Sequence, residues 1–269
     1  MGLIKRLLYK TRKYYDDDFD WDNYTQSYQR RLKDNESQYR TISTKSQLSF
    51  DTATGKVKSE GAPIPPRQNL ILEAIGLLAP SSVHEIGCGS GDNLANGMIL
   101  FPKIRYTGGD RGHTQLELAL SRHPQLKGQI GMQDITMPYS HLWPQADLVY
   151  TSAVTMHIHT AVSHFVALAN MVRMAESYVL LIENWQCHNY VQDIQNMFKG
   201  GHLDWSSLYI HRLDGSTGAR GILLSKFELK LPILHSDSQM REGAKASAQR
   251  LKRGDKDSAR GLFGFIRSF

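Results

Sequence analysis

The feature of the sequence that most constrains the fold is a glycine-rich turn within Val83–Leu94, which reads V-H-E-I-G-C-G-S-G-D-N-L. An apolar run reaches the carboxylate Glu85 and then passes through three glycines at alternate positions, Gly87, Gly89 and Gly91. Asp92 follows and is suited to a helix N-cap, so the stretch predicts a strand, a tight turn and a helix. Glycines at this spacing permit positive φ angles and remove the Cβ atoms that would hold a ligand away from backbone N–H groups. We therefore expect a small-molecule site here, against the alternative of an ordinary strand-to-helix connection.

Length and cysteine usage limit the class of protein. With 269 residues and 41% hydrophobic content, the chain is long enough for one sizeable domain with additions, or for two small domains. The two cysteines, Cys88 and Cys187, are too few for a disulfide framework and favour a reducing compartment. The sequence has neither an apolar run of roughly eighteen residues nor the hydrophobic region of a signal peptide. These features predict a cytoplasmic globular protein.

The formal net charge of +6 is concentrated at the two ends of the chain. The basic residues there are Lys5, Arg6, Lys10, Arg12 and Lys13 near the start, and Arg241, Lys245, Arg250, Lys252, Arg253, Lys256 and Arg260 near the end. Apolar residues at helical spacing accompany the first group: Leu3, Ile4, Leu7 and Leu8. Such ends suit a peripheral contact with an anionic membrane surface, the phosphates of a nucleic acid, or no partner at all. The middle of the chain is nearly balanced in charge, which makes a nucleic acid the less favoured partner.

Composition divides the chain into three parts. Residues 1–60 are expected to form an N-terminal extension placed to cap a substrate. Within it, Asp16–Tyr24 interleaves carboxylates with aromatic rings, a mixture typical of a carbohydrate site and equally of an exposed loop. The cluster G-A-P-I-P-P that begins at Gly61 opens the main domain, residues 61–235. A flexible basic tail is expected at 236–269.

Apolar runs alternate with helical patterns in the main domain, which predicts parallel strands joined by right-handed crossovers. The expected strands are Ser82–Ile86, Ile104–Gly109, Gly128–Gln133, Ala146–Thr151 and Tyr178–Ile182, followed by an antiparallel hairpin over Leu208–Leu213 and Gly221–Lys226. Helices are expected over Tyr24–Leu32, Gln68–Leu78 and Thr160–Met174, and around Leu116. The polar segment Thr41–Glu60 is expected to be a loop.

Polar residues stand at the ends of five successive strands: Glu85, Asp110, Asp134, Thr151 and Glu183. Ligands of open α/β sheets bind beyond the carboxyl ends of the strands, so these residues are expected to share a site. Asp110 stands where a carboxylate would accept both hydroxyl protons of a ribose. Asp134 is placed to take an exocyclic amine, and Glu85 to approach a cationic or amino-bearing ligand.

Four stretches, E-I-G-C-G-S-G, Y-T-G-G-D, Q-D-I and D-L-V-Y-T-S, resemble in order and spacing the motifs of class I S-adenosylmethionine-dependent methyltransferases, over roughly Gln68–Lys226. The resemblance implies a Rossmann-like, doubly wound α/β fold with a mostly parallel seven-stranded sheet and an antiparallel last hairpin. It implies S-adenosyl-L-methionine as cofactor, with its methionine end on the glycine turn, its ribose on Asp110 and its adenine beside Asp134 and Ile135. The cofactor-binding residues so implied are Glu85, Gly87, Cys88, Gly89, Gly91, Asp110, Asp134, Ile135 and Thr151. A nicotinamide dehydrogenase is disfavoured because the turn does not read G-x-G-x-x-G.

The segment Thr151–His159, T-S-A-V-T-M-H-I-H, bears on the methyl acceptor. It lacks the motifs of common base methylation. It resembles the T-S-G-V-L-I-H-I segments of methyltransferases of surface polysaccharide and sugar modification, with Ala153 in place of Gly and Thr155 in place of Leu. Transfer of a methyl group to a hydroxyl needs a proton acceptor, a role that suits histidine. We predict O-methylation of a sugar or glycan hydroxyl, with His157 as the base, ahead of His159, two residues further along an extended segment.

Alternatives stay open around this segment. His157 has the alternative role of a hydrogen-bonding partner of the cofactor or the turn. Glu183 is expected to orient the histidine, to bind a sugar hydroxyl or to be structural, and Asn184, Trp185 and His188 are expected acceptor contacts on the same rim. The histidine spacing does not match a zinc site, so no metal is predicted. The competing functions are methylation of another small molecule, and a non-catalytic protein of this fold that binds a nucleic acid or a partner through its basic ends.

Overall fold

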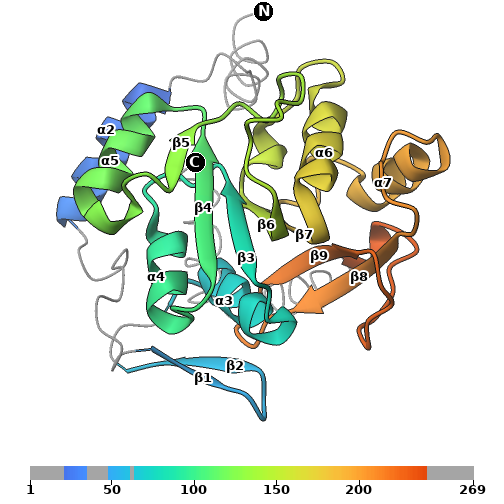
Figure 1. Cartoon of the computed structure of the whole chain (residues 1–269), viewed down its shortest axis with the longest axis horizontal. Helices are drawn as coiled ribbons and strands as arrows, with labels where there is room; N and C mark the ends of the chain where they lie inside the picture. The colour runs from blue at the N-terminus through green and yellow to red at the C-terminus, as the bar shows by residue number, and fades with distance from the viewer. Residues whose placement is uncertain (1–20, 35–47, 61–63, 241–269) are drawn as a thin grey trace, which may run out of the picture.

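The molecule is built on a seven-stranded sheet (Figure 1). The computed structural model describes residues 21–34, 48–60 and 64–240. The strands are β3 (Ser82–Ile86), β4 (Arg105–Asp110), β5 (Ile130–Met132), β6 (Ala146–Ser152), β7 (Ala175–Ile182), β8 (Tyr209–Asp214) and β9 (Arg220–Ser225). Their order is β5-β4-β3-β6-β7-β9-β8; the first five are parallel, and β9 is antiparallel to both β7 and β8. The predicted Rossmann-like α/β fold with an antiparallel end is confirmed.

Register brings the carboxyl ends of the parallel strands together at one edge of the sheet. Ile86 of β3 pairs with Gly109 of β4 on one side and with Thr151 of β6 on the other. Thr151 in turn pairs with Leu181 of β7. The residues that immediately follow these positions therefore stand side by side, as the strand-end pattern predicted.

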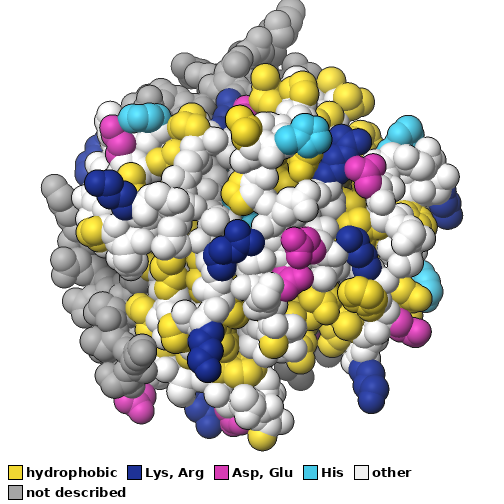
Figure 2. All heavy atoms as spheres, viewed as in Figure 1, with side chains coloured by type: hydrophobic (Ala, Val, Ile, Leu, Met, Phe, Trp, Pro, Cys, Tyr) yellow, Lys and Arg dark blue, Asp and Glu magenta, His cyan; other side chains and the backbone are white. Residues whose placement is uncertain are grey.

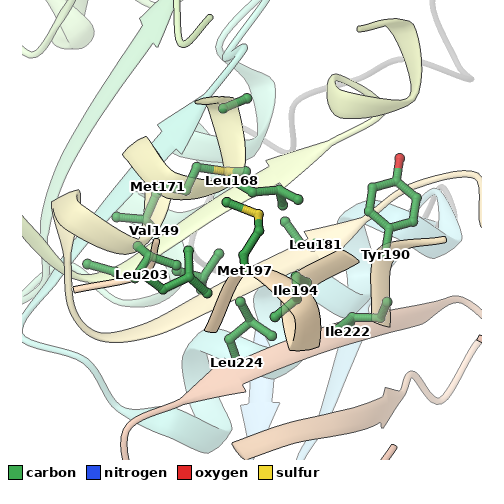
Figure 3. Packing of buried hydrophobic residues seen from close by; sticks show 14 of the residues in the cluster. Val149, Leu168, Met171, Leu181, Tyr190, Ile194, Met197, Leu203, Ile222 and Leu224 are labelled. Carbon is green, nitrogen blue, oxygen red and sulfur yellow. The ribbon is translucent and has the colours of Figure 1, made fainter. Parts of the chain in front are cut away.

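Helices cover both faces of the sheet, with α3 (Pro66–Leu78), α4 (Asp92–Leu100) and α5 (His113–Arg122) on one face and α6 (Ser163–Met174) and α7 (Tyr190–Lys199) on the other. Alternate residues of each strand enter the two cores, so Leu148 packs with the first group and Val149 with the second. Figure 3 shows the second core, where Leu181 and Leu224 of the sheet face Met171 of α6 and Met197 of α7. The helix α7 is absent from the sequence-based prediction.

The N-terminal part packs against this domain. Helix α2 (Trp21–Asp34) extends the predicted helix and lies against α5. The segment predicted to be a loop instead contains a hairpin, β1 (Leu48–Asp51) and β2 (Lys56–Ser59), beneath α3 and α4 (Figure 1). Leu48 and Val57 of the hairpin form a small core with Ile64 and with the buried Leu72 of α3.

The start of helix α4 differs from the prediction by one residue. Gly91, with φ of 76°, is the N-cap of α4, and Asp92 is the first helical residue rather than the predicted cap. The segment after β9 returns to the sheet, where Leu234 N–H donates to the Ile210 carbonyl of β8 at 2.7 Å. The predicted amphipathic start, most of Asp16–Tyr24 and most of the basic tail lie outside the described residues. Among those described, no helix is long and apolar enough to span a bilayer.

Candidate functional site

A cavity of about 260 Å³ opens at the carboxyl ends of β3, β4 and β6. Eight of the predicted site residues line it: Glu85, Gly87, Cys88, Gly89, Asp110, Asp134, Ile135 and His157. Four do not: Gly91, Thr151, His159 and Glu183. Helix α2, which belongs to the extension expected to cap a substrate, supplies a further wall, and so do side chains that were not among the predicted site residues.

The glycine turn forms the floor of the cavity. Gly87 and Cys88 both donate their N–H groups to the Gly109 carbonyl, at 2.7 and 3.0 Å, which fastens the turn to β4. Gly89 has φ of 49°, and a Cβ added there would meet only the Gln115 side chain at 3.4 Å, so its backbone is open to a ligand. Gly91 differs, because its Cβ would meet Leu126 at 2.6 Å. It packs at the start of α4 and does not line the cavity, so its predicted contact with the cofactor stays a prediction.

Asp110 joins two backbone segments of the cavity wall. One carboxylate oxygen accepts the N–H of Gly89 at 2.8 Å, and the other accepts the N–H of Gly112 at 2.7 Å. Burial raises the pKa of the Asp110 carboxyl, and these two hydrogen bonds oppose the rise. Each oxygen has a further lone pair for a ligand hydroxyl. The side chain thus has the position and the capacity that a ribose-binding carboxylate needs.

Glu85 is a fully buried carboxyl in the cavity wall. Its Oε1 accepts a hydrogen bond from Asn93 Nδ2 at 2.6 Å. The nearby Tyr150 hydroxyl lowers the pKa of Glu85 and so favours the charged carboxylate. Among the described residues, however, Glu85 Oε2 and the Tyr150 hydroxyl have no hydrogen bond of good geometry. Desolvation raises the pKa of Glu85 to about 8. A buried acceptor without a partner, at the edge of a cavity, is suited to a cationic donor from a ligand.

Asp134 and Ile135 lie where β5 ends. The Asp134 carboxylate accepts the N–H and the hydroxyl of Thr136, at 3.0 and 2.6 Å, so it shapes its own turn and keeps one oxygen for a ligand. Gln133 also lines the cavity, and its Oε1 accepts a hydrogen bond from His84 Nε2 at 2.8 Å. Burial lowers the pKa of His84 to about 4, so this histidine is neutral at pH 7. Gln133 belongs to the Q-D-I stretch but was not among the predicted site residues.

Helix α2 supplies Tyr24 and Tyr28 to the cavity wall. The helix is held on α5 by Thr25, whose hydroxyl accepts a hydrogen bond from Gln115 Nε2 at 2.7 Å and lies 3.0 Å from that of Thr114. Burial raises the pKa of Tyr28 to about 12. The two tyrosines are four residues apart and stack on the same face of the helix, with ring centroids 6.2 Å apart. That spacing was the signal available in the sequence.

The segment after β6 is a tight turn, whereas the prediction was an extended segment. Ala153 has φ of 58°, and a 3-10 turn, η3 (Thr155–His157), follows. His157 lines the cavity. His159 is exposed, and its Nε2 donates to the Met156 carbonyl at 2.7 Å, away from the cavity lining.

Glu183 and Thr151 lie behind this turn. Thr151 is fully buried and donates its hydroxyl to the Glu183 carboxylate at 3.0 Å. Burial raises the pKa of Glu183, while hydrogen bonds from the turn and the charge of Arg67 oppose the rise. Neither residue lines the cavity.

The expected acceptor contacts on the rim, Asn184, Trp185 and His188, are half-buried and do not line the cavity. Asn184 accepts the N–H of Gln186 at 3.1 Å, and Trp185 packs edge-on against Tyr190. The His188 ring is stacked between those of His159 and His164. Within the described ranges, no group of three or more His, Cys, Asp or Glu side chains is arranged to hold a metal ion.

Comparison with known proteins gives similarities in structure only. No protein family model and no curated protein sequence matches the chain. Among solved structures, Streptomyces venezuelae DesVI is similar over 59% of this chain and 91% of that chain, with 11% identity and a TM-score of 0.47. Magnesium protoporphyrin IX methyltransferase (ChlM) from Synechocystis PCC 6803, solved with bound SAM, is similar over 60% of this chain and 79% of that chain (14% identity, TM-score 0.44). N-methyltransferase NodS from Bradyrhizobium japonicum WM9, solved with S-adenosyl-L-homocysteine, is similar over 59% and 83% (19% identity, TM-score 0.42). All three TM-scores are below 0.5 and all three identities are below 20%.

Proposed function

We propose that the chain is an S-adenosylmethionine-dependent methyltransferase. One observation carries the proposal: a single cavity at the carboxyl edge of the sheet contains the open glycine turn, Asp110 and Asp134 together. The turn and the two carboxylates are about 20 residues apart along the chain and belong to three separate sequence motifs. A cavity of about 260 Å³ with a few polar groups suits a small organic ligand.

The residues present fit this cofactor. The unpartnered Glu85 Oε2 would receive the ammonium of its methionine end, beside the open backbone of Gly89. Asp110 would accept the ribose hydroxyls, and Asp134 with Ile135 would border the adenine. Gly91, Thr151, His159 and Glu183 are left out of the direct contacts because they do not line the cavity.

The proposed reaction is transfer to a hydroxyl of a sugar or glycan. The cofactor supplies an electrophilic methyl group on a sulfonium. His157 would accept the proton that the acceptor hydroxyl loses as its oxygen takes the methyl group, and S-adenosylhomocysteine would be left as the second product. His157 is supported as the base because it is the histidine that lines the cavity. The sugar acceptor is supported by the likeness of Thr151–His159 to the corresponding segments of sugar-modifying methyltransferases.

The proposed location rests on cysteine usage, and the proposed further partner rests on the basic ends of the chain. The chain has two cysteines, too few for a disulfide framework, which supports a reducing compartment and hence the cytoplasm. On the face shown in Figure 2, Lys and Arg side chains are interspersed with Asp and Glu. A peripheral membrane contact through the basic ends is retained as a proposal.

Two measurements test the function. Calorimetry of the purified chain with S-adenosyl-L-homocysteine should show one binding site, and an absence of binding would refute the cofactor. Labelled S-adenosylmethionine supplied with glycan, lipid-linked sugar, RNA and small-molecule acceptors should label a hydroxyl of a sugar-containing acceptor. Labelling of RNA alone would refute the proposed acceptor while leaving the cofactor intact.

A further inference from the structure

The turn that carries His157 starts in a strained conformation. Ala153 has φ of 58°, in the left-handed region, which costs a residue with a Cβ roughly 1–2 kcal/mol relative to its ordinary conformation. The position is also where the sugar-modifying segments have glycine, which reaches this region without that cost. Such strain persists only where surrounding contacts determine it.

Glu183 provides those contacts from the end of β7. Its Oε2 accepts the N–H groups of Val154 and Met156, both at 3.1 Å. Its Oε1 accepts the Thr151 hydroxyl and lies 3.2 Å from the Val154 nitrogen. A single buried carboxylate therefore satisfies the backbone donors on both sides of Thr155, directly before His157.

Two further contacts fix the same turn from the α7 side. The Thr155 hydroxyl donates to the Tyr190 hydroxyl at 3.2 Å, and His188 Nε2 donates to the Thr155 carbonyl at 3.1 Å. On the cavity side, the Val154 side chain packs directly over Gly87, where any Cβ would clash with it. The turn thus forms one wall of the cavity and is anchored from behind by buried polar groups.

We propose that Glu183 is a positioning residue: its carboxylate holds the strained turn Ala153–His157, and thereby sets Val154 against the glycine turn and His157 at the cavity. The catalytic meaning rests on the proposed function, because only a methyl-transfer site needs His157 there. The structural claim does not, since it concerns the free protein. Glu183 touches neither the cavity nor its contents.

Hydrogen exchange of backbone amides in the free protein tests the claim directly. In Glu183→Met, which keeps volume but removes both acceptors, the Val154 and Met156 amides should exchange at least about ten-fold faster than in the wild type. In Glu183→Gln, protection should be largely retained. The glutamine oxygen can accept both N–H groups while its NH₂ donates to the Thr151 hydroxyl, which then accepts a hydrogen bond instead of donating one. Thr151→Val is the matched control, because it leaves both backbone contacts of the carboxylate in place.

The strain supplies a second test. Adding Ala153→Gly to Glu183→Met should restore part of the lost protection, because glycine adopts the left-handed conformation without being held. Unchanged exchange of Val154 and Met156 in Glu183→Met would overturn the proposal. So would equal acceleration of the Val179 amide in the centre of the sheet, which would make Glu183 a general stabilising residue.

Two measurements on the wild type complete the design. If Glu183→Met does not fold, hydrogen exchange of the wild-type protein tests the claim instead. The claim would be refuted if the Val154 and Met156 amides exchanged as fast as those of the exposed Thr160 and Ala161. Calorimetry with S-adenosyl-L-homocysteine is run on the same wild-type sample. Absence of binding there would refute the proposed function and leave the exchange result standing, so the two failures are distinguishable.

Discussion

Glu85→Gln should change how the stability of the protein depends on pH. The pKa of Glu85 is raised from 4.5 to about 8 in the folded chain, chiefly by desolvation. Between these values the folded state binds a proton that the unfolded state releases, so the free energy of unfolding falls as pH rises. The slope is about 1.4 kcal/mol per pH unit, and the loss over the whole interval is on the order of 4 kcal/mol.

Glutamine is the neutral counterpart of the protonated side chain and can keep the Asn93 hydrogen bond. The variant should therefore match the wild type near pH 5 and exceed it near pH 8. For a chain of this size, the difference near pH 8 corresponds to about 10 °C in melting temperature. Thermal unfolding of the free protein, followed by circular dichroism at several pH values, measures it. Glu176→Gln, at an exposed position of β7, is the matched control and should follow the wild type.

Curves for wild type and Glu85→Gln that stay parallel from pH 5 to pH 8 would refute the reasoning, because they would show that Glu85 is already ionised in the free protein. The raised pKa values of Asp110 and Glu183 do not confuse the comparison, since both groups are present in both proteins.

Three further substitutions test the site. Asp110→Ala should weaken binding of S-adenosyl-L-homocysteine on the order of ten- to a hundred-fold by calorimetry, because charge-assisted hydrogen bonds are lost; unchanged affinity would remove Asp110 from the cofactor site. His157→Ala should keep that affinity and lower labelled methyl transfer roughly 10²- to 10⁴-fold, and undiminished transfer would exclude it as the base. Ala153→Gly should raise the free energy of unfolding by roughly 0.5–1 kcal/mol in denaturant titration, since relief of strain exceeds the added entropy of the unfolded chain; a loss of stability would contradict the strain assigned to that residue.

The sheet was predictable because its signals are local. Apolar runs ending in polar residues gave β3 at its observed bounds and placed Glu85, Asp110 and Asp134 at one edge. Thr151 shows the limit of that rule: it ends a strand, but its side chain points behind the turn to Glu183. The direction in which a side chain points at a strand end depends on whether the residue has an odd or an even position along the strand, and on the turn that follows. The identity of the last residue alone does not specify it.

The missed elements have different physical causes. The β1–β2 hairpin is polar overall, yet Leu48, Phe50 and Val57 alternate with polar residues around a turn in which Asp51 accepts the Ala53 and Thr54 N–H groups. That period-two pattern was present but short. The contribution of α2 to the cavity was signalled only in outline, by the expected capping role of residues 1–60 and by the spacing of Tyr24 and Tyr28. Its placement depends on packing against α5, a contact distant in sequence.

That packing also bears on how the chain is made. Thr25 of α2 and its partner Gln115 of α5 are 90 residues apart. At a synthesis rate of about 5–20 residues per second, α2 leaves the ribosome roughly 5 to 20 seconds before the surface that receives it exists. The wall formed by Tyr24 and Tyr28 is therefore completed late during translation, after the glycine turn has emerged. A nascent chain halted before α5 would carry the glycine turn without this wall, and a codon change that slows translation between the two helices would lengthen the interval.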